Sequence, residues 1–161
     1  MWNKAIRGIN RTVENLTALF LAAMVVLIFL QILMRLVMAQ SFSWTEEAAR
    51  YLMIWLTFLA ASYGFRRGAH VGVSVVVDRL PVRFQRWVQA VAGLVCLVFF
   101  ALLVIFGFEL MDRSMMQRSP ALNIPMGYIY SVIPISGILM ALNLIDVLIR
   151  TIRTGRGEEQ S

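Results

Sequence analysis

The densest group of charged side chains lies where the first long apolar run of the chain ends and the second begins. Ionisable groups at membrane depth are costly and often mark a proton or ion site. A structural role is favoured here, because these charges lie at the ends of the apolar runs rather than near their middles. We expect Glu46 to pair with Arg50 one helical turn later. We also expect Arg35 to be a cross-helix partner of Glu47.

Isolated polar residues elsewhere offer little for catalysis. His70 has no second histidine, no cysteine and no acid at ligand spacing, so we expect it to fix a turn rather than bind a metal. Gln31 is expected to make an interhelical hydrogen bond, and Asp146 to pair with Arg150, rather than to line a transport path. The chain has no nucleophile beside a base and no phosphate-binding glycine loop. We therefore predict no catalytic, substrate-binding or metal-binding residue, no cofactor and no enzymatic activity.

Four long apolar runs must position these residues. Hydrophobic residues make up 60% of the chain and its mean hydropathy is +0.75, whereas a soluble domain is about 45–50% apolar. Each run is long enough for a helix to cross about 30 Å of hydrocarbon. We predict an all-α membrane protein with one domain over residues 1–161. Its four transmembrane helices are expected at about 13–37, 46–66, 87–111 and 126–150, followed by a disordered tail over 154–161.

The basic residues predict which helix ends face the cytoplasm. Eleven of the 15 Lys and Arg residues lie in the N-terminal segment, between the second and third runs, and in the C-terminal tail. With four spans, these three segments share one side of the membrane, and translocation disfavours basic loops. Both termini are therefore expected in the cytoplasm. Because the net charge of +6 comes from residues at span ends, membrane lipid rather than nucleic acid is the expected partner.

The ends of three predicted spans carry local signals. Residues 1–15 have an amphipathic pattern, which suits either a helix lying in the membrane interface or a cytoplasmic extension of the first span. Ser43 and Glu46 have the spacing of a capping box at the start of the second span, and Trp44 suits an interface anchor. Pro134 predicts a bend in the fourth span, because proline removes one helical hydrogen bond.

The conformation of residues 68–86 stays open. Valines at positions 71, 73, 75 and 77 alternate as in a strand, but an open strand edge in lipid leaves backbone groups unpaired. An interfacial or re-entrant helix is the alternative, and periodicity does not decide between the two.

The order and spacing of several motifs resemble the small membrane subunit of tripartite ATP-independent periplasmic (TRAP) transporters. The resemblance covers nearly the whole chain, although no single motif is specific by itself. The matching residues are Gln31 and Arg35, Trp44-Thr45-Glu46-Glu47 with Arg50, Trp55 to Ala61, Arg67-Gly68-Ala69-His70-Val71, Asp78-Arg79-Leu80-Pro81, Ser119 to Pro125, and Ile133-Pro134-Ile135.

The resemblance implies a role that depends on partners. A small subunit of this kind pairs with a large membrane subunit that holds the solute and ion sites, and a periplasmic solute-binding protein delivers the solute. It implies ion-driven uptake of organic acids, usually coupled to sodium, across the bacterial inner membrane. The small subunit would be a scaffold. We expect structural or partner-contact roles for Gln31, Arg35, Trp44, Glu46, Glu47, Arg50, Trp55, Gly68, His70, Asp78, Pro125 and Pro134.

The residues themselves also favour a scaffold. The midplanes of the runs are apolar, whereas a protein that carries a polar solute usually has broken helices and polar groups there. Small residues such as Ser62, Gly64 and Gly137 are expected to allow close helix packing.

Two alternatives stay open. A self-sufficient dimeric four-helix transporter typically needs an acid embedded in its first span, and residues 16–34 contain none. An anchor of a redox complex would often hold haem, and the single histidine excludes ligation by two histidines of this chain.

Overall fold

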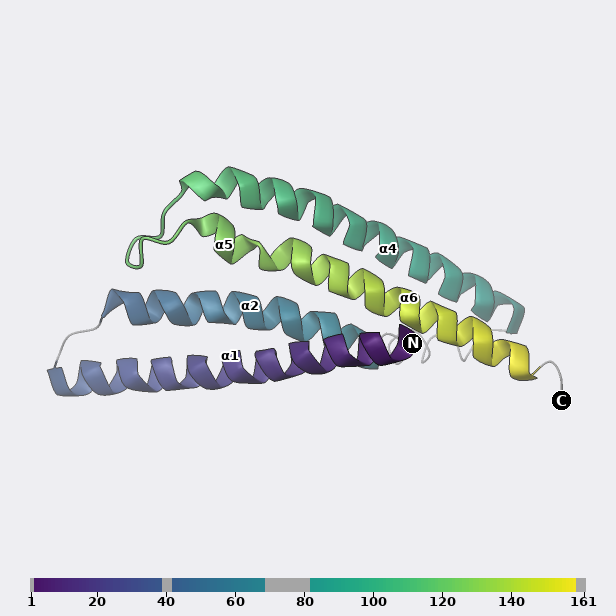
Figure 1. The fold of residues 1–161 in the computed structure, drawn as a ribbon, viewed down its shortest axis with the longest axis horizontal. Coiled ribbons are helices and arrows are strands. Elements are labelled where there is room, and N and C mark those ends of the chain that lie inside the picture. The colour runs from purple at the N-terminus through teal and green to yellow at the C-terminus, as the bar shows by residue number, and fades with distance from the viewer. Residues whose placement is uncertain (1, 39–41, 69–81, 159–161) are drawn as a thin grey trace.

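The structure is a set of long antiparallel helices. The computed structural model describes residues 2–38, 42–68 and 82–158. Its elements are α1 (Trp2–Met38), α2 (Ser43–Gly68), α4 (Val82–Arg113), the short 3-10 helix η1 (Ser114–Met116), α5 (Met126–Tyr130) and α6 (Val132–Glu158). Figure 1 shows the four long helices running along one common axis. The predicted all-α architecture is confirmed for this part of the chain.

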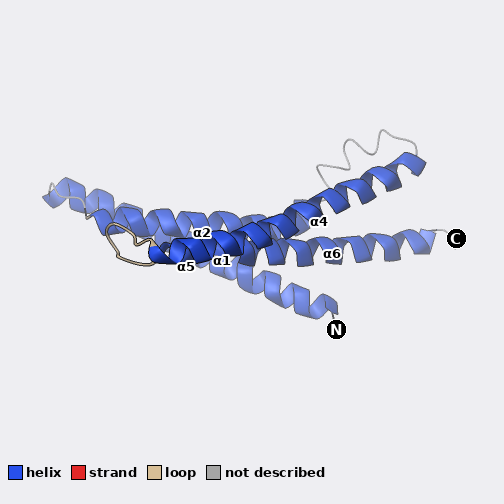
Figure 2. Ribbon diagram, turned by 90° about the horizontal axis from the view of Figure 1, so that it is seen from above, coloured by secondary structure: helices blue, strands red, loops and turns tan. Residues whose placement is uncertain are grey.

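The helices form an open array rather than a closed bundle. α2 packs against α1 on one side and against α6 on the other, and α6 in turn packs against α4. In Figure 1, α1 and α4 therefore lie at the two edges, with α2 and α6 between them. Figure 2 shows that α1, α4 and α6 spread apart toward the end that holds both termini. η1, α5 and the loop between them lie at the opposite end (Figure 1).

Three apolar segments in the described part of the chain are long enough to cross a membrane. They are Ile6–Val37, Ala90–Met116 and Met126–Val147. Four spans were predicted. The remaining long helix, α2, is not one of these three segments. It is less apolar because it carries Arg50, Thr57 and Ser62 among its aliphatic residues. Since α2 lies between two other helices, it has fewer positions that must face lipid.

Burial differs sharply between the helices. Only 6% of the apolar window in α1 is buried, compared with 44% of the window over α5 and α6. Large side chains such as Leu19, Phe29 and Leu36 on α1 are more than half exposed, and so are Leu94 and Phe106 on α4. Exposed apolar surface on this scale faces lipid or a protein partner.

Both ends of the described chain are helical. α1 is continuous from Trp2, so the amphipathic N-terminal segment and the first long apolar run form one helix. At 37 residues it is about 55 Å long, which exceeds the hydrocarbon thickness. At the other end, α6 continues to Glu158, so residues 154–158 of the predicted disordered tail are helical. The prediction of disorder was wrong for residues 154–158, because a helix outside the hydrocarbon does not need apolar residues. Residues 159–161 lie outside the described part.

The helix is interrupted three residues before Pro134, the residue from which a bend was predicted. α5 ends at Tyr130 and α6 begins at Val132, with Ser131 between them. A helical hydrogen bond to the Tyr130 carbonyl would have to come from residue 134, and proline has no N–H to donate. The turns on either side stay connected, because the Ser131 N–H donates to Gly127 O at 3.0 Å and the Ile135 N–H donates to Ser131 O at 3.3 Å.

Candidate functional site

The 117–125 loop is compact and held by its own hydrogen bonds. Arg118 and Pro125 form an antiparallel bridge. The Met126 N–H donates to Gln117 O at 2.8 Å, and the Ser119 N–H donates to Ile124 O at 2.9 Å. Asn123 has a φ of 55°, a left-handed conformation that asparagine tolerates better than most residues. This loop is therefore a defined surface at one end of the helices.

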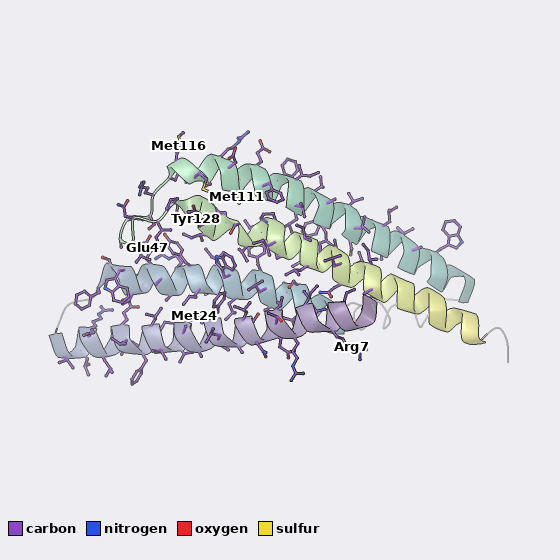
Figure 3. All side chains as sticks on the ribbon, in the orientation of Figure 1. Arg7, Met24, Glu47, Met111, Met116 and Tyr128 are labelled. Carbon is purple, nitrogen blue, oxygen red and sulfur yellow. The ribbon has the colours of Figure 1, made fainter. Side chains whose placement is uncertain are left out.

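Glu47 connects this loop to α2. Its Oε2 accepts hydrogen bonds from the backbone N–H of Ala121 at 2.7 Å and of Leu122 at 3.1 Å. Its Oε1 accepts a hydrogen bond from the Tyr51 hydroxyl one turn later. The residue is only 7% exposed, and Figure 3 shows it between α2 and the loop. We call Glu47, Tyr51 and the two loop amides the Glu47 latch.

In the described part of the chain, the donors to Glu47 are two backbone amides and a hydroxyl rather than a cation. Backbone and hydroxyl donors aimed at a carboxylate stabilise its ionised form, and hydrogen bonds to a charged group are among the stronger ones. The predicted partner Arg35 is not among the groups bonded to Glu47. Arg35 lies exposed in the last turn of α1. The cross-helix ion pair was wrong because the loop supplies the donors, and the loop is more than 70 residues away in sequence.

Glu46 and Arg50 do form the predicted ion pair, at 2.9 Å. Their side chains are 59% and 62% exposed, so the pair is screened by solvent and contributes little stability. The predicted capping box is different in the structure. Ser43 is already the first residue of α2, and Phe42 O accepts from the Thr45 N–H at 3.1 Å and from the Thr45 hydroxyl at 2.7 Å.

The other predicted contact residues do not converge on one site. Trp44 is exposed at the start of α2, as an interface anchor would be. Trp55 packs edge-on against Phe20 of α1, with ring centroids 6.1 Å apart. Gln31 is partly buried on α1, and Gly68 ends α2.

The two predicted prolines have local roles. Pro125 is the residue that precedes α5. Pro134 is buried in the first turn of α6. His70 and Asp78 lie outside the described residues.

A second polar cluster joins three helices near the opposite end. Asn10 of α1 and Asn143 of α6 exchange two side-chain hydrogen bonds, at 2.7 and 3.0 Å. The remaining amide hydrogens donate to backbone carbonyls: Asn143 to Ser62 O of α2 at 2.8 Å, and Asn10 to Ile6 O at 3.0 Å. Asn10, Asn143 and Ser62 are all buried. We call this the asparagine clasp. The clasp was not predicted from the sequence; a signal that could have pointed to it is the stripe Ile6, Asn10, Val13 and Thr17 at helical spacing.

Asp146 lies one turn beyond Asn143 and is 1% exposed. The ion pair predicted between Asp146 and Arg150 stays a prediction, because the Arg150 side chain lies outside the described part. Among the described residues, no group of three or more His, Cys, Asp or Glu could hold a metal ion.

The asparagine clasp predicts a measurable coupling between α1 and α6. Replacing Asn10 or Asn143 with alanine should destabilise the protein, and the double variant should lose less than the sum, because the two amides bond each other. Interhelical hydrogen bonds in membranes contribute about 0.6 kcal/mol on average and up to about 1.7 kcal/mol. A double-mutant cycle in detergent unfolding measures this coupling. Thr57→Ala is the control, since the Thr57 hydroxyl bonds only its own helix, to Met53 O at 2.7 Å. Strict additivity of the two asparagine changes would contradict the clasp.

Comparison with known proteins gives a consistent result. Residues 24–154 match the family model for the DctQ component of tripartite ATP-independent periplasmic transporters. A Haemophilus influenzae protein with the description of a TRAP transporter small permease is 34% identical over 144 residues, covering 89% of each chain. The isethionate TRAP transporter permease protein DctMQ of Oleidesulfovibrio alaskensis is 35% identical over 112 residues, which are 68% of this chain but 18% of that protein. The C4-dicarboxylate small permease DctQ of Vibrio cholerae is 34% identical over 106 residues, or 66% of this chain and 46% of that protein.

Proposed function

Because this chain belongs to the family of DctQ components of TRAP transporters, we propose that it is the non-catalytic scaffold subunit of a secondary solute importer. In this proposal it works in the inner membrane with a large membrane subunit and a periplasmic solute-binding protein. An ion gradient, carried by sodium, drives uptake of an organic acid. All four long helices cross the membrane and both termini lie in the cytoplasm.

The observation that carries the proposal is the match to a much longer permease. The 112 residues shared with the DctMQ protein are only 18% of that chain, and a sialic acid TRAP permease is matched over 24% of its length. In these relatives, the segment like this chain is covalently joined to a larger membrane protein. A separate chain with the same segment would meet such a partner in the bilayer. This favours the subunit interpretation over a self-sufficient dimer or a redox anchor.

The structure supports a scaffold rather than a solute carrier. The clasp is a buried polar cluster between three helices, and each side-chain amide N–H of its two asparagines is already donated to another protein atom. The helix array is open, and both of its edges present apolar side chains. Buried polar groups therefore join the helices to each other, and the exposed surface suits lipid and an apolar partner.

The Glu47 latch supports a fixed surface on the periplasmic side. In the proposed topology, the 117–125 loop and the start of α2 face the periplasm. Glu47 holds these two segments together, and a cleft of about 200 Å³ between them is bordered by Ser43, Arg50 and Pro120. A soluble binding protein docks better on an ordered surface, because less conformational entropy is lost.

Co-expression with a TRAP large subunit from the same genome tests the proposal. We expect a tag on this chain to retain the large subunit through detergent purification. Proteoliposomes should accumulate a labelled organic acid from a panel of dicarboxylates and sialic acids only when both membrane chains, the binding protein and an inward sodium gradient are present. Potassium in place of sodium is the matched control. Full uptake without this chain would contradict the scaffold role.

A further inference from the structure

An apolar groove lies where α4 meets the first turn of α6, in a candidate membrane span. It has a volume of about 310 Å³ and no polar lining, and it is bordered by Phe99, Leu102, Phe106 and Leu110 of α4 and by Ile133 of α6. Its floor is Gly107, where the missing side chain lets α6 approach closely. Phe99 and Phe106 are 56% and 60% exposed. The groove is therefore open to whatever surrounds α4 in the membrane.

The groove lies inside the apolar segment Ala90–Met116, which is long enough to cross a membrane. From Phe99 to Leu110 the helix rises about 16 Å, at 1.5 Å per residue. Half of the hydrocarbon core is about 15 Å thick. The middle of the segment Ala90–Met116 is residue 103, so the groove lies at the depth of the hydrocarbon, mostly on the side of the 117–125 loop, where an acyl chain of that leaflet can reach it.

Charged residues continue the same helix face beyond the groove. Phe99, Leu102, Phe106, Glu109 and Arg113 follow one another at alternating steps of three and four residues, so they share one face of α4. Glu109 and Arg113 form an exposed ion pair, with side chains 48% and 77% exposed. One positive and one negative group therefore lie at the end of the groove nearer the 117–125 loop.

We propose that this groove binds one phosphatidylethanolamine molecule of the leaflet next to the 117–125 loop. One acyl chain lies along Phe99, Leu102 and Phe106. The phosphate accepts hydrogen bonds from the Arg113 guanidinium, and the ammonium donates to the Glu109 carboxylate. Ethanolamine fits better than choline, because a quaternary ammonium has no N–H to donate. A transmembrane helix laid along the same face would bury the Glu109–Arg113 pair, and taking an ion pair out of water is costly. This inference is independent of the scaffold role.

Native mass spectrometry of the purified, delipidated full-length chain tests the site. Titration with dioleoyl phosphatidylethanolamine should give one retained lipid, held about tenfold more tightly than the phosphatidylcholine of the same chains. Leu102→Trp, which fills the groove, should abolish this preference. Ile105→Trp is the matched control, since Ile105 is an exposed apolar residue of α4 that does not line the groove. Glu109→Gln should shift the preference from phosphatidylethanolamine toward phosphatidylglycerol.

A second measurement needs no variant. Phosphatidylethanolamine with a photoreactive group at the end of its acyl chain should label the unmodified protein near Phe99 and Leu102. Labelling spread evenly over the exposed faces of α1 and α4 would overturn the proposal. Equal lipid retention by the two tryptophan variants would also overturn it. So would loss of the large subunit, with unchanged lipid binding, in Leu102→Trp, because that result makes the groove a subunit contact.

Discussion

Replacing Gly107 with leucine is expected to separate α4 from α6. A Cβ atom at Gly107 would lie 2.9 Å from Pro134 Cδ, 3.0 Å from Pro134 N and 3.1 Å from Ile133 Cγ2. Two of these atoms belong to a proline in the first turn of a helix, so neither can rotate away as a flexible side chain would. Forcing extra methylene groups into a packed site costs about 1–3 kcal/mol and occasionally more. We expect Gly107→Leu to lie at or above the top of that range.

Alanine at two glycines gives a matched comparison. Gly107→Ala adds only the clashing Cβ and should lower the unfolding midpoint in detergent. Gly64→Ala adds the same atom to α2, where nothing lies within 4 Å. That change should be neutral or stabilising by up to about 1 kcal/mol, because alanine is the better helix former. Equal midpoints for the two alanine variants would show that the α4–α6 contact at Pro134 is not tightly packed.

Gly107→Leu should also disturb the end of the helix array that holds η1 and α5. α5, with the loop before it, packs closely against α4. A Cβ atom at Gly127 of α5 would lie 2.6 Å from Met111 O of α4. α6 is attached to α2 through Asn143 and Ser62. If α4 moves away, it carries η1 and α5 with it and breaks the connection at Ser131. Cysteine pairs across α4 and α6 should then lose their cross-linking yield, whereas pairs across α1 and α2 should keep it.

Replacing Glu47 with alanine is the second change with a large expected effect. It removes the acceptor for the Ala121 and Leu122 amides and for the Tyr51 hydroxyl. Donors that lose a charged acceptor in a buried position are left with their desolvation cost. We expect hydrogen exchange at the Ala121 and Leu122 amides to become faster by about tenfold or more, because exchange reports local opening. Exchange in the middle of α2 should stay unchanged.

Glu46→Ala is the matched control for the latch. Both changes remove one acid near the N-terminus of α2, so they have similar effects on the helix dipole. Glu46→Ala removes only the exposed ion pair with Arg50, and such pairs contribute about 0–1 kcal/mol. Loop exchange should therefore stay slow in Glu46→Ala. Glu47→Gln should be intermediate, because its amide oxygen can still accept from one loop N–H. Unchanged exchange at both loop amides in Glu47→Ala would contradict the latch.

Much of the fold could be predicted from local sequence. An apolar run that is long enough to cross the bilayer as a helix predicts a membrane helix. The long helices and their insertion therefore follow from the composition and length of the runs. The Glu46–Arg50 pair follows from one helical turn of spacing, and the break before Pro134 follows from a missing N–H. Membership of the family could also be recognised, because it rests on the order of motifs along the chain. Each of these properties depends on residues close together in sequence.

The tertiary structure alone decided which residues serve the site. Glu47 was expected to pair with Arg35, but its donors come from a loop 74 and 75 positions later. Asn10 and Asn143 are 133 positions apart, and helical spacing says only that each faces some neighbour. Ser62 and Gly137 do lie at close contacts, as expected, whereas Gly64 has open space beside it. Gly107 gave no distinguishing local signal. Periodicity fixes the face of a helix that is buried, but the partner of that face depends on the order in which the helices pack, and that order is set by contacts between distant segments.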